Sequence, residues 1–223
     1  MNILDNIFWH TLSGPHAHLS DGGATARRYM RGFSPIAAFA DPAAPDLAAL
    51  APHCAPGEPL YCDGWSGSAP PGWRVDAETT MYRMLWRGAM PDDAAGDAVP
   101  LGAQHVEQAV ALAALTRPGP FGPRTIELGD YFGVIEEGRL VAMAGERLCA
   151  PGLREISGVC THPDYQGRGM ARRLMEKLIA RHMARGERSF LHVMRANEGA
   201  HQLYLKMGFD DYLESVVRVV ART

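Results

Sequence analysis

The stretch HPDYQGRGMARRL, residues 162–174, decides the fold of this 223-residue chain. A strand-like pattern at 154–161 leads into it, and an amphipathic helix pattern begins at Gly169. The first backbone N–H groups of a helix have no partner within the helix, and the helix dipole adds positive potential there. Gly167 and Gly169 let the backbone approach a ligand closely. The stretch therefore predicts an anion site, for a phosphate or pyrophosphate group, between a strand and a helix.

Two common nucleotide-binding loops do not fit this stretch. A P-loop carries a Lys-Ser/Thr pair after its second glycine, and the dinucleotide fingerprint has a third glycine where this chain has Arg172. A plain glycine turn remains open as the alternative. The local charge favours the anion site, because basic residues outnumber acidic ones over 154–206 although the whole chain has a net charge of −3. Four basic residues at helical spacing are predicted to form a largely solvated face: Arg173, Lys177, Arg181 and Arg185.

Proline usage divides the chain into a proline- and loop-rich first part and a second part with regular elements. From residue 103 the elements follow the order α, β, β, β, α, β, α, β, which predicts an α/β (α+β) fold with helices packed on a mixed sheet. We predict an N-terminal region over 1–75 and a principal domain over 76–223. Predicted helices cover 103–116, 169–185 and 197–208, and predicted strands cover 79–88, 130–148 as a hairpin, 154–161, 188–194 and 211–220.

Composition argues against several classes of function. A net charge of −3 does not favour a nucleic-acid partner. No apolar run approaches the roughly 20 residues that span a bilayer, and the first residues lack a signal-peptide pattern, so we expect a cytoplasmic protein without a membrane partner. The four cysteines form no C-x-x-C pair, and His16 and His18 have no evident third ligand, so no metal site is predicted.

Two motifs together resemble the GNAT superfamily of N-acetyltransferases. Residues 166–171, QGRGMA, fit the family's Q/R-x-x-G-x-G/A signature, with alanine at its last position. Residues 197–209, NEGAHQLYLKMGF, match its N-x-x-A-x-x-L-Y-x-x-x-G-F pattern. The resemblance covers about residues 79–223, and it implies a mixed sheet with splayed central strands. The first seventy-odd residues resemble, more loosely, the extra N-terminal region of the glycine N-acyltransferase-like branch, which suggests a degenerate GNAT-like half.

The resemblance implies acetyl-CoA as the donor substrate and no metal. In that family the glycine turn binds the pyrophosphate, the preceding strand pairs with the pantetheine arm, and the strand splays from the one at 189–193 to admit the arm. The implied acceptor partner is an amine of a small molecule or peptide, and a homodimer remains open. The residues implied to bind the donor are Val159, Cys160, Thr161, Gln166, Gly167, Arg168, Gly169, Met170, Ala171 and Asn197.

Acyl transfer to an amine requires an uncharged amine, an oxyanion donor and a proton for the leaving thiolate. Tyr204 lies two helical turns after Asn197, and the resemblance implies that it protonates the thiolate. Glu155 and His192 are alternative bases, acting directly or through water, and the choice between them stays open. A strand N–H near Val159 is the expected oxyanion donor.

The sequence therefore predicts an N-acetyltransferase that transfers acetyl directly from acetyl-CoA to a primary amine within a ternary complex. Two alternatives remain open. One is an acyltransferase that uses a longer acyl-CoA, and the other is a CoA-binding sensor or scaffold with little catalysis. Nothing in the sequence indicates the identity of the acceptor.

Overall fold

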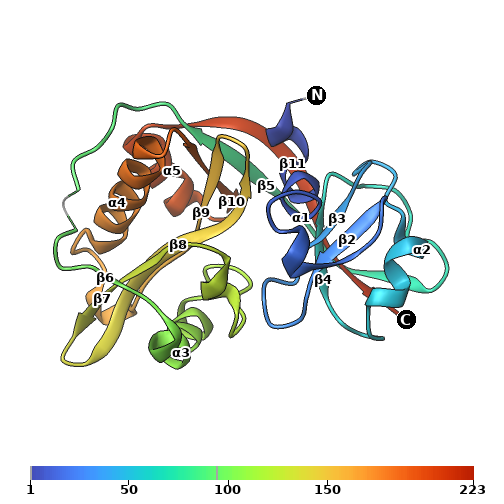
Figure 1. Cartoon of the computed structure of the whole chain (residues 1–223), viewed down its shortest axis with the longest axis horizontal. Coiled ribbons are helices and arrows are strands. Elements are labelled where there is room, and N and C mark those ends of the chain that lie inside the picture. Colours follow the sequence, from blue (N-terminus) through green and yellow to red (C-terminus); the bar gives the residue numbers. More distant parts are fainter. Residues whose placement is uncertain (1, 94) are drawn as a thin grey trace.

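The computed structural model describes residues 2–93 and 95–223, which form a large mixed sheet, a small sheet and flanking helices (Figure 1). The strands of the large sheet are β4 (Leu60–Asp63), β5 (Trp73–Trp86), β6 (Val99–Pro100), β7 (Tyr131–Glu136), β8 (Arg139–Ala150), β9 (Leu153–Thr161), β10 (Arg188–Met194) and β11 (Phe209–Arg222). Their order is β4-β11-β5-β10-β9-β8-β7-β6, and all neighbours are antiparallel except β9 and β10. The predicted α/β (α+β) class with a mixed sheet is confirmed.

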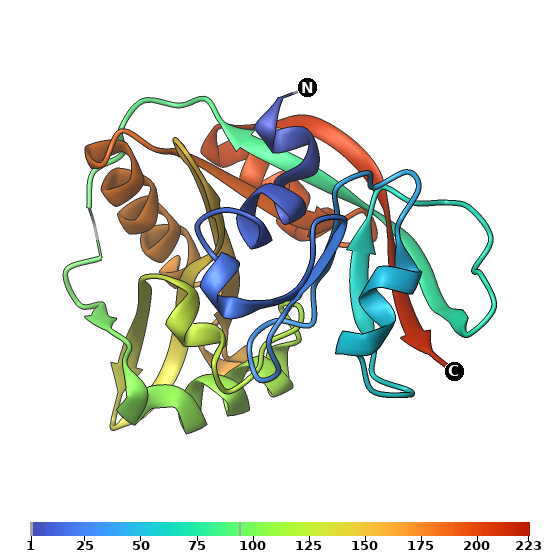
Figure 2. The same ribbon diagram turned by 45° about the vertical axis from the view of Figure 1, so that its right-hand side comes forward.

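Helices cover both faces of the large sheet (Figures 1 and 2). Apolar residues at helical spacing on α4 (Met170–Ala184), such as Leu174 and Leu178, pack with α5 (Glu198–Met207) into one core. On the other face lie α3 (Val106–Thr116) and α1 (Ile7–Leu12), each with its own apolar cluster. The remaining helices are α2 (Leu47–Leu50) and the 3-10 turns η1 (Ile3–Asn6), η2 (Ala17–Leu19), η3 (Ala51–His53), η4 (Ala103–His105), η5 (Thr125–Leu128) and η6 (Pro163–Tyr165). No helix in the described part is both long and apolar enough to cross a membrane.

The long strands β5 and β11 join the N-terminal part of the chain to the rest (Figure 2). They pair along their whole length, from Phe209 opposite Trp86 to Arg222 opposite Trp73. The second half of β5 also pairs with β10, whereas β4 pairs with the last part of β11. A small antiparallel sheet, β1 (Ser20–Gly22), β2 (Ala26–Tyr29) and β3 (Ala37–Phe39), packs beside them. The division into residues 1–75 and 76–223 stays a prediction, and β4 shows that the first region contributes a strand to the large sheet.

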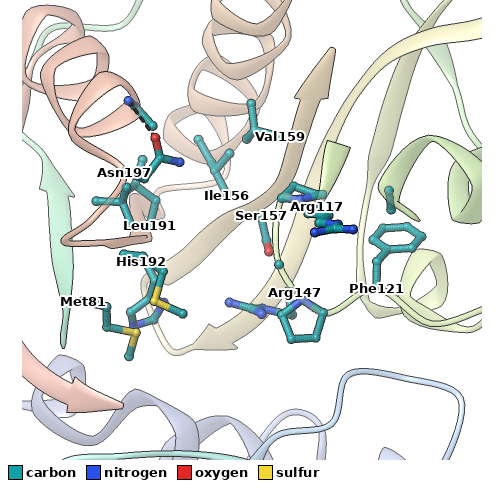
Figure 3. A pocket seen from close by; sticks show the side chains of 18 of the residues that line it. Met81, Arg117, Phe121, Arg147, Ile156, Ser157, Val159, Leu191, His192 and Asn197 are labelled. Atoms are coloured by element: carbon teal, nitrogen blue, oxygen red, sulfur yellow. Dashed lines mark hydrogen bonds between the residues drawn. The ribbon is translucent and has the colours of Figure 1, made fainter. Parts of the chain in front are cut away.

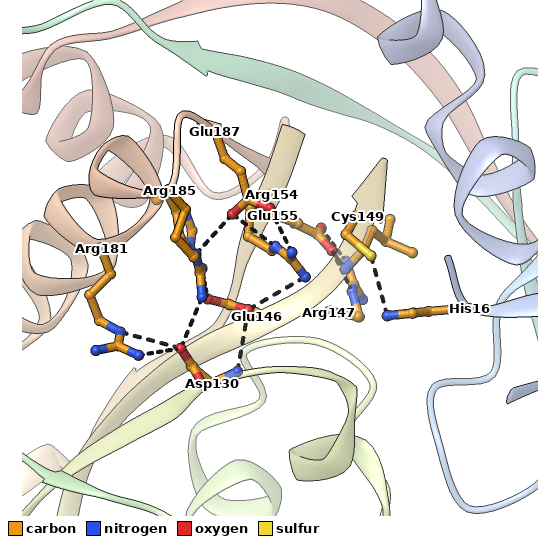
Figure 4. A network of polar contacts seen from close by, with 12 residues as sticks. His16, Asp130, Glu146, Arg147, Cys149, Arg154, Glu155, Arg181, Arg185 and Glu187 are labelled. Atoms are coloured by element: carbon orange, nitrogen blue, oxygen red, sulfur yellow. Dashed lines mark hydrogen bonds and ion pairs between the residues drawn. The ribbon is translucent and has the colours of Figure 1, made fainter. Parts of the chain in front are cut away.

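The basic stripe of α4 binds acidic residues from two other segments. Arg173 pairs with Asp97 at 3.1 Å and Lys177 pairs with Asp93 at 2.7 Å, both from the acidic linker before β6. Arg181 pairs with Asp130 at 2.7 Å, just before β7 (Figure 4). The stripe therefore holds neighbouring segments against the helix instead of forming a plain solvated face.

A buried polar contact ties the N-terminal part to β8. His16 is 6% exposed, and its two ring nitrogens lie 2.7 Å from the Tyr29 hydroxyl and 3.3 Å from the Cys149 sulfur (Figure 4). Burial lowers the pKa of His16 to about 4. The histidine is thus a packed, uncharged part of the core.

We expect acid to destabilise the protein through His16. In the unfolded chain the imidazole takes up a proton near pH 6.5, whereas in the folded chain it does so only near pH 4. Stability contributed by the uncharged ring is therefore lost as the pH falls through this window. Urea denaturation should show a fall in unfolding free energy between pH 7 and pH 5 that is about 2 kcal/mol smaller in His16→Gln than in the wild type. The exposed neighbour His18 gives the control, because the unfolding free energy of His18→Gln should fall as much as that of the wild type. Equal falls in all three proteins would contradict the assignment to His16.

Candidate functional site

The central strands β9 and β10 separate within the sheet. They pair only where Leu153, Arg154 and Glu155 face residues 188–190, although β9 continues to Thr161 and β10 to Met194. A cavity of about 620 Å³ opens where they part, lined by residues 156–159 of β9 and 191–194 of β10 (Figure 3). A strand edge without a partner leaves backbone N–H and C=O groups free to bind an extended ligand. The predicted splay of the central strands is confirmed.

The cavity is lined from both faces of the sheet. Side chains of a strand alternate between faces, so Leu191 and Val193 belong to the core beneath α4 and α5, whereas His192 lies beside Phe8 of α1. Residues from α5 complete the first side, and residues from α3 and the N-terminal part complete the second. The gap between β9 and β10 therefore opens toward α4 and α5 on one face of the sheet and toward α3 and the N-terminal part on the other.

The glycine turn at the start of α4 is open and has free donors. Gly167 and Gly169 have φ values of 78° and 74°, and a Cβ added at either would meet no atom within 4 Å. The first backbone hydrogen bond of the helix runs from the Arg173 N–H to the Gly169 carbonyl at 3.1 Å. Within the described chain, the N–H groups of residues 167–172 have no hydrogen-bond acceptor. The arrangement fits the predicted anion site, because consecutive donors point out of a helix N-terminus.

The remaining side chains of this turn flank it or anchor the helix. Arg168 is exposed and lies over the Tyr165 ring at 4.7 Å. Gln166 has an extended backbone, and it is exposed. Met170 is 5% exposed and packs into the core, so it fixes the helix start, while Ala171 is half-buried.

Helix α5 brings Asn197 and Tyr204 to the cavity wall. The Asn197 side-chain oxygen accepts a hydrogen bond from the Ala200 N–H at 3.2 Å, which caps the helix (Figure 3). Its amide nitrogen has no hydrogen-bond partner among the described residues. The Tyr204 ring packs edge-on against Phe209, with centroids 6.1 Å apart. Burial raises the pKa of Tyr204 to about 12, so its hydroxyl keeps its proton at neutral pH.

The three expected donor-binding residues of β9 have different surroundings. Val159 lines the cavity. The Cys160 side chain packs under α3, and burial raises the pKa of its thiol to about 11. The Thr161 hydroxyl is buried, and no partner for it occurs among the described residues. Only the backbone of Cys160 is therefore suited to face a ligand.

Glu155 lies behind the cavity wall in a closed set of contacts. It is 0% exposed, and it accepts hydrogen bonds from the Arg147 guanidinium at 2.7 and 3.0 Å and from the Leu148 N–H at 3.1 Å (Figure 4). The Nδ1 atom of His192 lies 2.7 Å from the same carboxylate. Burial alone would raise the pKa of Glu155, but Arg147 and His192 outweigh it and lower the pKa to about 2. The carboxylate is therefore charged and fully occupied.

His192 is engaged at both ring nitrogens. Its Nε2 atom accepts a hydrogen bond from the Arg83 Nε–H at 2.9 Å, so Nδ1 carries the proton that it donates to Glu155. Arg83 also binds the Asp63 carboxylate and the Leu4 carbonyl. Burial lowers the pKa of His192, which keeps the ring uncharged. A base role for Glu155 or His192 stays a prediction, and neither has a free lone pair in this arrangement.

Several cavity residues were not predicted from the sequence. Arg147 and Ser157 come from β8 and β9, and Phe8, Ile36 and Tyr61 come from the N-terminal part. A group of three or more His, Cys, Asp or Glu side chains able to hold a metal does not occur in residues 2–93 and 95–223. The N-terminal residues carry no local motif, because only the tertiary packing brings them to the cavity.

Comparisons with known proteins agree with this geometry. The sequence model of the acetyltransferase (GNAT) family matches residues 101–209. The crystal structure of a protein from Novosphingobium aromaticivorans, assigned as an acetyltransferase of the GNAT family, is 36% identical, with 100% of each chain covered and a TM-score of 0.92.

Two further relatives are more distant or partial. N-alpha-acetyltransferase RimI from Mycobacterium tuberculosis is 39% identical over 82 residues, which are 35% of this chain and 51% of that enzyme. The match thus spans about half of that enzyme's length. A GCN5-related N-acetyltransferase from Kribbella flavida has a TM-score of 0.61 at 18% identity, over 100% of this chain and 96% of that one. At this identity the likeness supports the fold alone.

Proposed function

Because the chain belongs to the GNAT acetyltransferase family, we propose that it transfers an acetyl group from acetyl-CoA to a primary amine in a ternary complex. The observation that carries this proposal is the separation of β9 from β10, which opens one cavity beside Val159, Asn197 and Tyr204. Much of the rate enhancement would come from holding the two substrates together in that cavity.

The residues of the glycine turn and the strand edge fit the donor. The free N–H groups of residues 167–172 suit a pyrophosphate, and the added space at Gly167 and Gly169 allows the phosphate oxygens to approach the backbone. The unpaired edge of Val159, Cys160 and Thr161 suits the amides of the pantetheine arm, with the free Asn197 amide beside it. The acetyl thioester would then lie between the strands, near Tyr204.

The proposed reaction is direct attack of the amine nitrogen on the thioester carbonyl carbon. The C–N bond forms, the C–S bond breaks, and the leaving thiolate takes the proton of the Tyr204 hydroxyl. The tyrosine recovers a proton from the nitrogen of the new amide, so the products are the acetylated amine and CoA. A backbone N–H of β9 near Val159 would stabilise the oxyanion.

We expect the donor site to depend on the left-handed backbone of Gly169. A valine at φ 74° is strained, so Gly169→Val should move the free N–H groups and raise KM for acetyl-CoA about tenfold. The KM is measured from the release of the CoA thiol, which a thiol reagent detects, with a panel of amines as acceptors. The same assay tests the proposed function itself.

Gly186 provides a matched control at the other end of the same helix. It has φ 72° and also has no atom within 4 Å of an added Cβ, so Gly186→Val carries the same backbone strain away from the cavity. Its KM should remain close to the wild-type value. Equal KM values for the two variants would contradict the donor site. Binding of acetyl-CoA without thiol release for any amine would instead support the sensor or scaffold alternative. A higher rate with a longer acyl-CoA would identify that acyl-CoA as the donor.

A further inference from the structure

The cavity has a part that faces away from α5, which we call the acceptor chamber. Its wall is made by Phe8, Ile36, Tyr61, Met81, Met194 and Val217. All but Met194 lie outside residues 101–209, which are the part that matches the family. Three of these residues, Phe8, Ile36 and Tyr61, come from the first region of the chain, so the part that matches the family model gives little information on what the chamber binds.

The walls of the chamber are apolar because of how the strands alternate. On β4, Leu60 and Cys62 are buried in one core, so Tyr61 and Asp63 face the opposite side. Tyr61 lines the chamber, whereas Asp63 is bound by Arg83. Phe8 is 5% exposed and packs edge-on against the His192 ring at 5.6 Å.

No carboxylate is available to an ammonium group in the cavity. Among its described lining residues the charged side chains are Arg117 and Arg147, and none is an aspartate or glutamate. The carboxylates behind the wall, Asp63 and Glu155, are each held by an arginine. A charged amine would therefore leave water for a place where the nearby carboxylates are already paired with arginines, which is unfavourable.

The proton balance of acetyl transfer points in the same direction. An uncharged amine releases one proton when its amide forms, and the leaving thiolate takes up one proton, so no additional base is required. An ammonium would release a second proton that some group must accept. His192 faces the chamber, and both of its ring nitrogens are occupied. Behind the wall, Glu155 is occupied by Arg147 and His192, and Asp63 is paired with Arg83. Tyr204, on the α5 side of the gap, keeps its proton at neutral pH because burial raises its pKa to about 12.

On the basis of the proposed acetyl transfer, we propose that the acceptor is a small primary amine with an apolar body, bound in the chamber as the uncharged free base. An aromatic or branched aliphatic body fits the apolar wall. The amine nitrogen would lie toward Ser157 and Tyr204, at the gap between the strands.

The pH dependence of two amines with the same ring tests the protonation state. For an arylalkylamine, which is mostly protonated at neutral pH, kcat/KM should rise about tenfold per pH unit from pH 6.5 to 8.5, following its free-base fraction. For an arylamine, which is uncharged in this range, kcat/KM should stay level. If kcat/KM rose with pH around the same midpoint for both amines, the proposal would be overturned, because the rise would then report a base of the enzyme that accepts the proton.

A charge placed in the chamber wall tests whether the body of the acceptor is apolar. The comparison is between Tyr61→Glu and its uncharged match Tyr61→Gln, each with the arylalkylamine and with a linear aliphatic diamine. The wild type should prefer the arylalkylamine at least about tenfold, and the glutamate should shift this preference toward the diamine at least about tenfold relative to the glutamine variant. Acetyl-CoA binding checks that each variant is folded, and the pair Met194→Glu and Met194→Gln repeats the test on another wall.

The outcomes separate this proposal from the proposed function. Thiol release that favours the diamine or a peptide amine in the wild type would overturn the apolar acceptor while acetyl transfer stands. Equal preferences in the glutamate and glutamine variants would show that the chamber does not hold the acceptor. No thiol release with any amine would contradict acetyl transfer itself.

Discussion

Replacing Tyr204 with phenylalanine lowers kcat by at least about a hundredfold and leaves KM for acetyl-CoA nearly unchanged, if the hydroxyl supplies the proton to the leaving thiolate. General acids of this kind typically contribute factors of roughly 10² to 10⁴. The ring can keep its edge-on contact with Phe209, so the variant loses the proton donor and little else. Steady-state kinetics with CoA thiol release measures both parameters.

A second tyrosine on the same core provides the control for Tyr204→Phe. Tyr82 on β5 stacks on His201 at 4.4 Å and does not line the cavity, so Tyr82→Phe should retain nearly full kcat. Equal activity of both variants would show that Tyr204 is only a packing residue. A large rise in KM with unchanged kcat would instead assign its hydroxyl to donor binding.

The sequence predicts local features of this protein well because they depend on neighbours along the chain. The strand, the glycine turn and the helix at 154–185 follow from hydrophobic period and helix-terminus chemistry, and the structure confirms them. Asn197 is the first residue of the predicted helix at 197–208, and in the structure its side-chain oxygen caps that helix. The separation of β9 from β10 is implied only by the resemblance to the GNAT family, and the structure confirms it.

Long-range contacts could not be predicted in this way. Glu155 and His192 were identified as separate candidates, but no spacing in the sequence shows that one binds the other 37 positions away. Their arginine partners come from β5 and β8, which neighbour these strands only in the folded sheet. The position of Phe8 in the chamber wall could not be predicted for the same reason, because the sequence of a short amphipathic helix does not show the surface against which it packs.

Replacing Glu155 with leucine lowers the free energy of unfolding by about 3–5 kcal/mol, since it leaves the Arg147 guanidinium buried without its counter-charge. Arg147 is only 13% exposed, so water replaces the two lost hydrogen bonds incompletely. The Nδ1–H group of His192 loses its acceptor as well. Urea denaturation at pH 7 measures the change, with the midpoint and slope compared between variants.

The double variant Glu155→Leu, Arg147→Met decides whether this loss comes from unpaired charge. A buried ion pair replaced as a whole by apolar side chains costs little or even stabilises, so the double variant should recover most of the loss. If it is as unstable as the single variant, the loss comes from packing around β9 and the charge argument is wrong.

The variant Glu155→Gln then separates the structural role of Glu155 from a chemical one. The amide still accepts the His192 hydrogen bond, so a folded Glu155→Gln enzyme with normal kcat would show that the carboxylate positions His192 and does not act as the base.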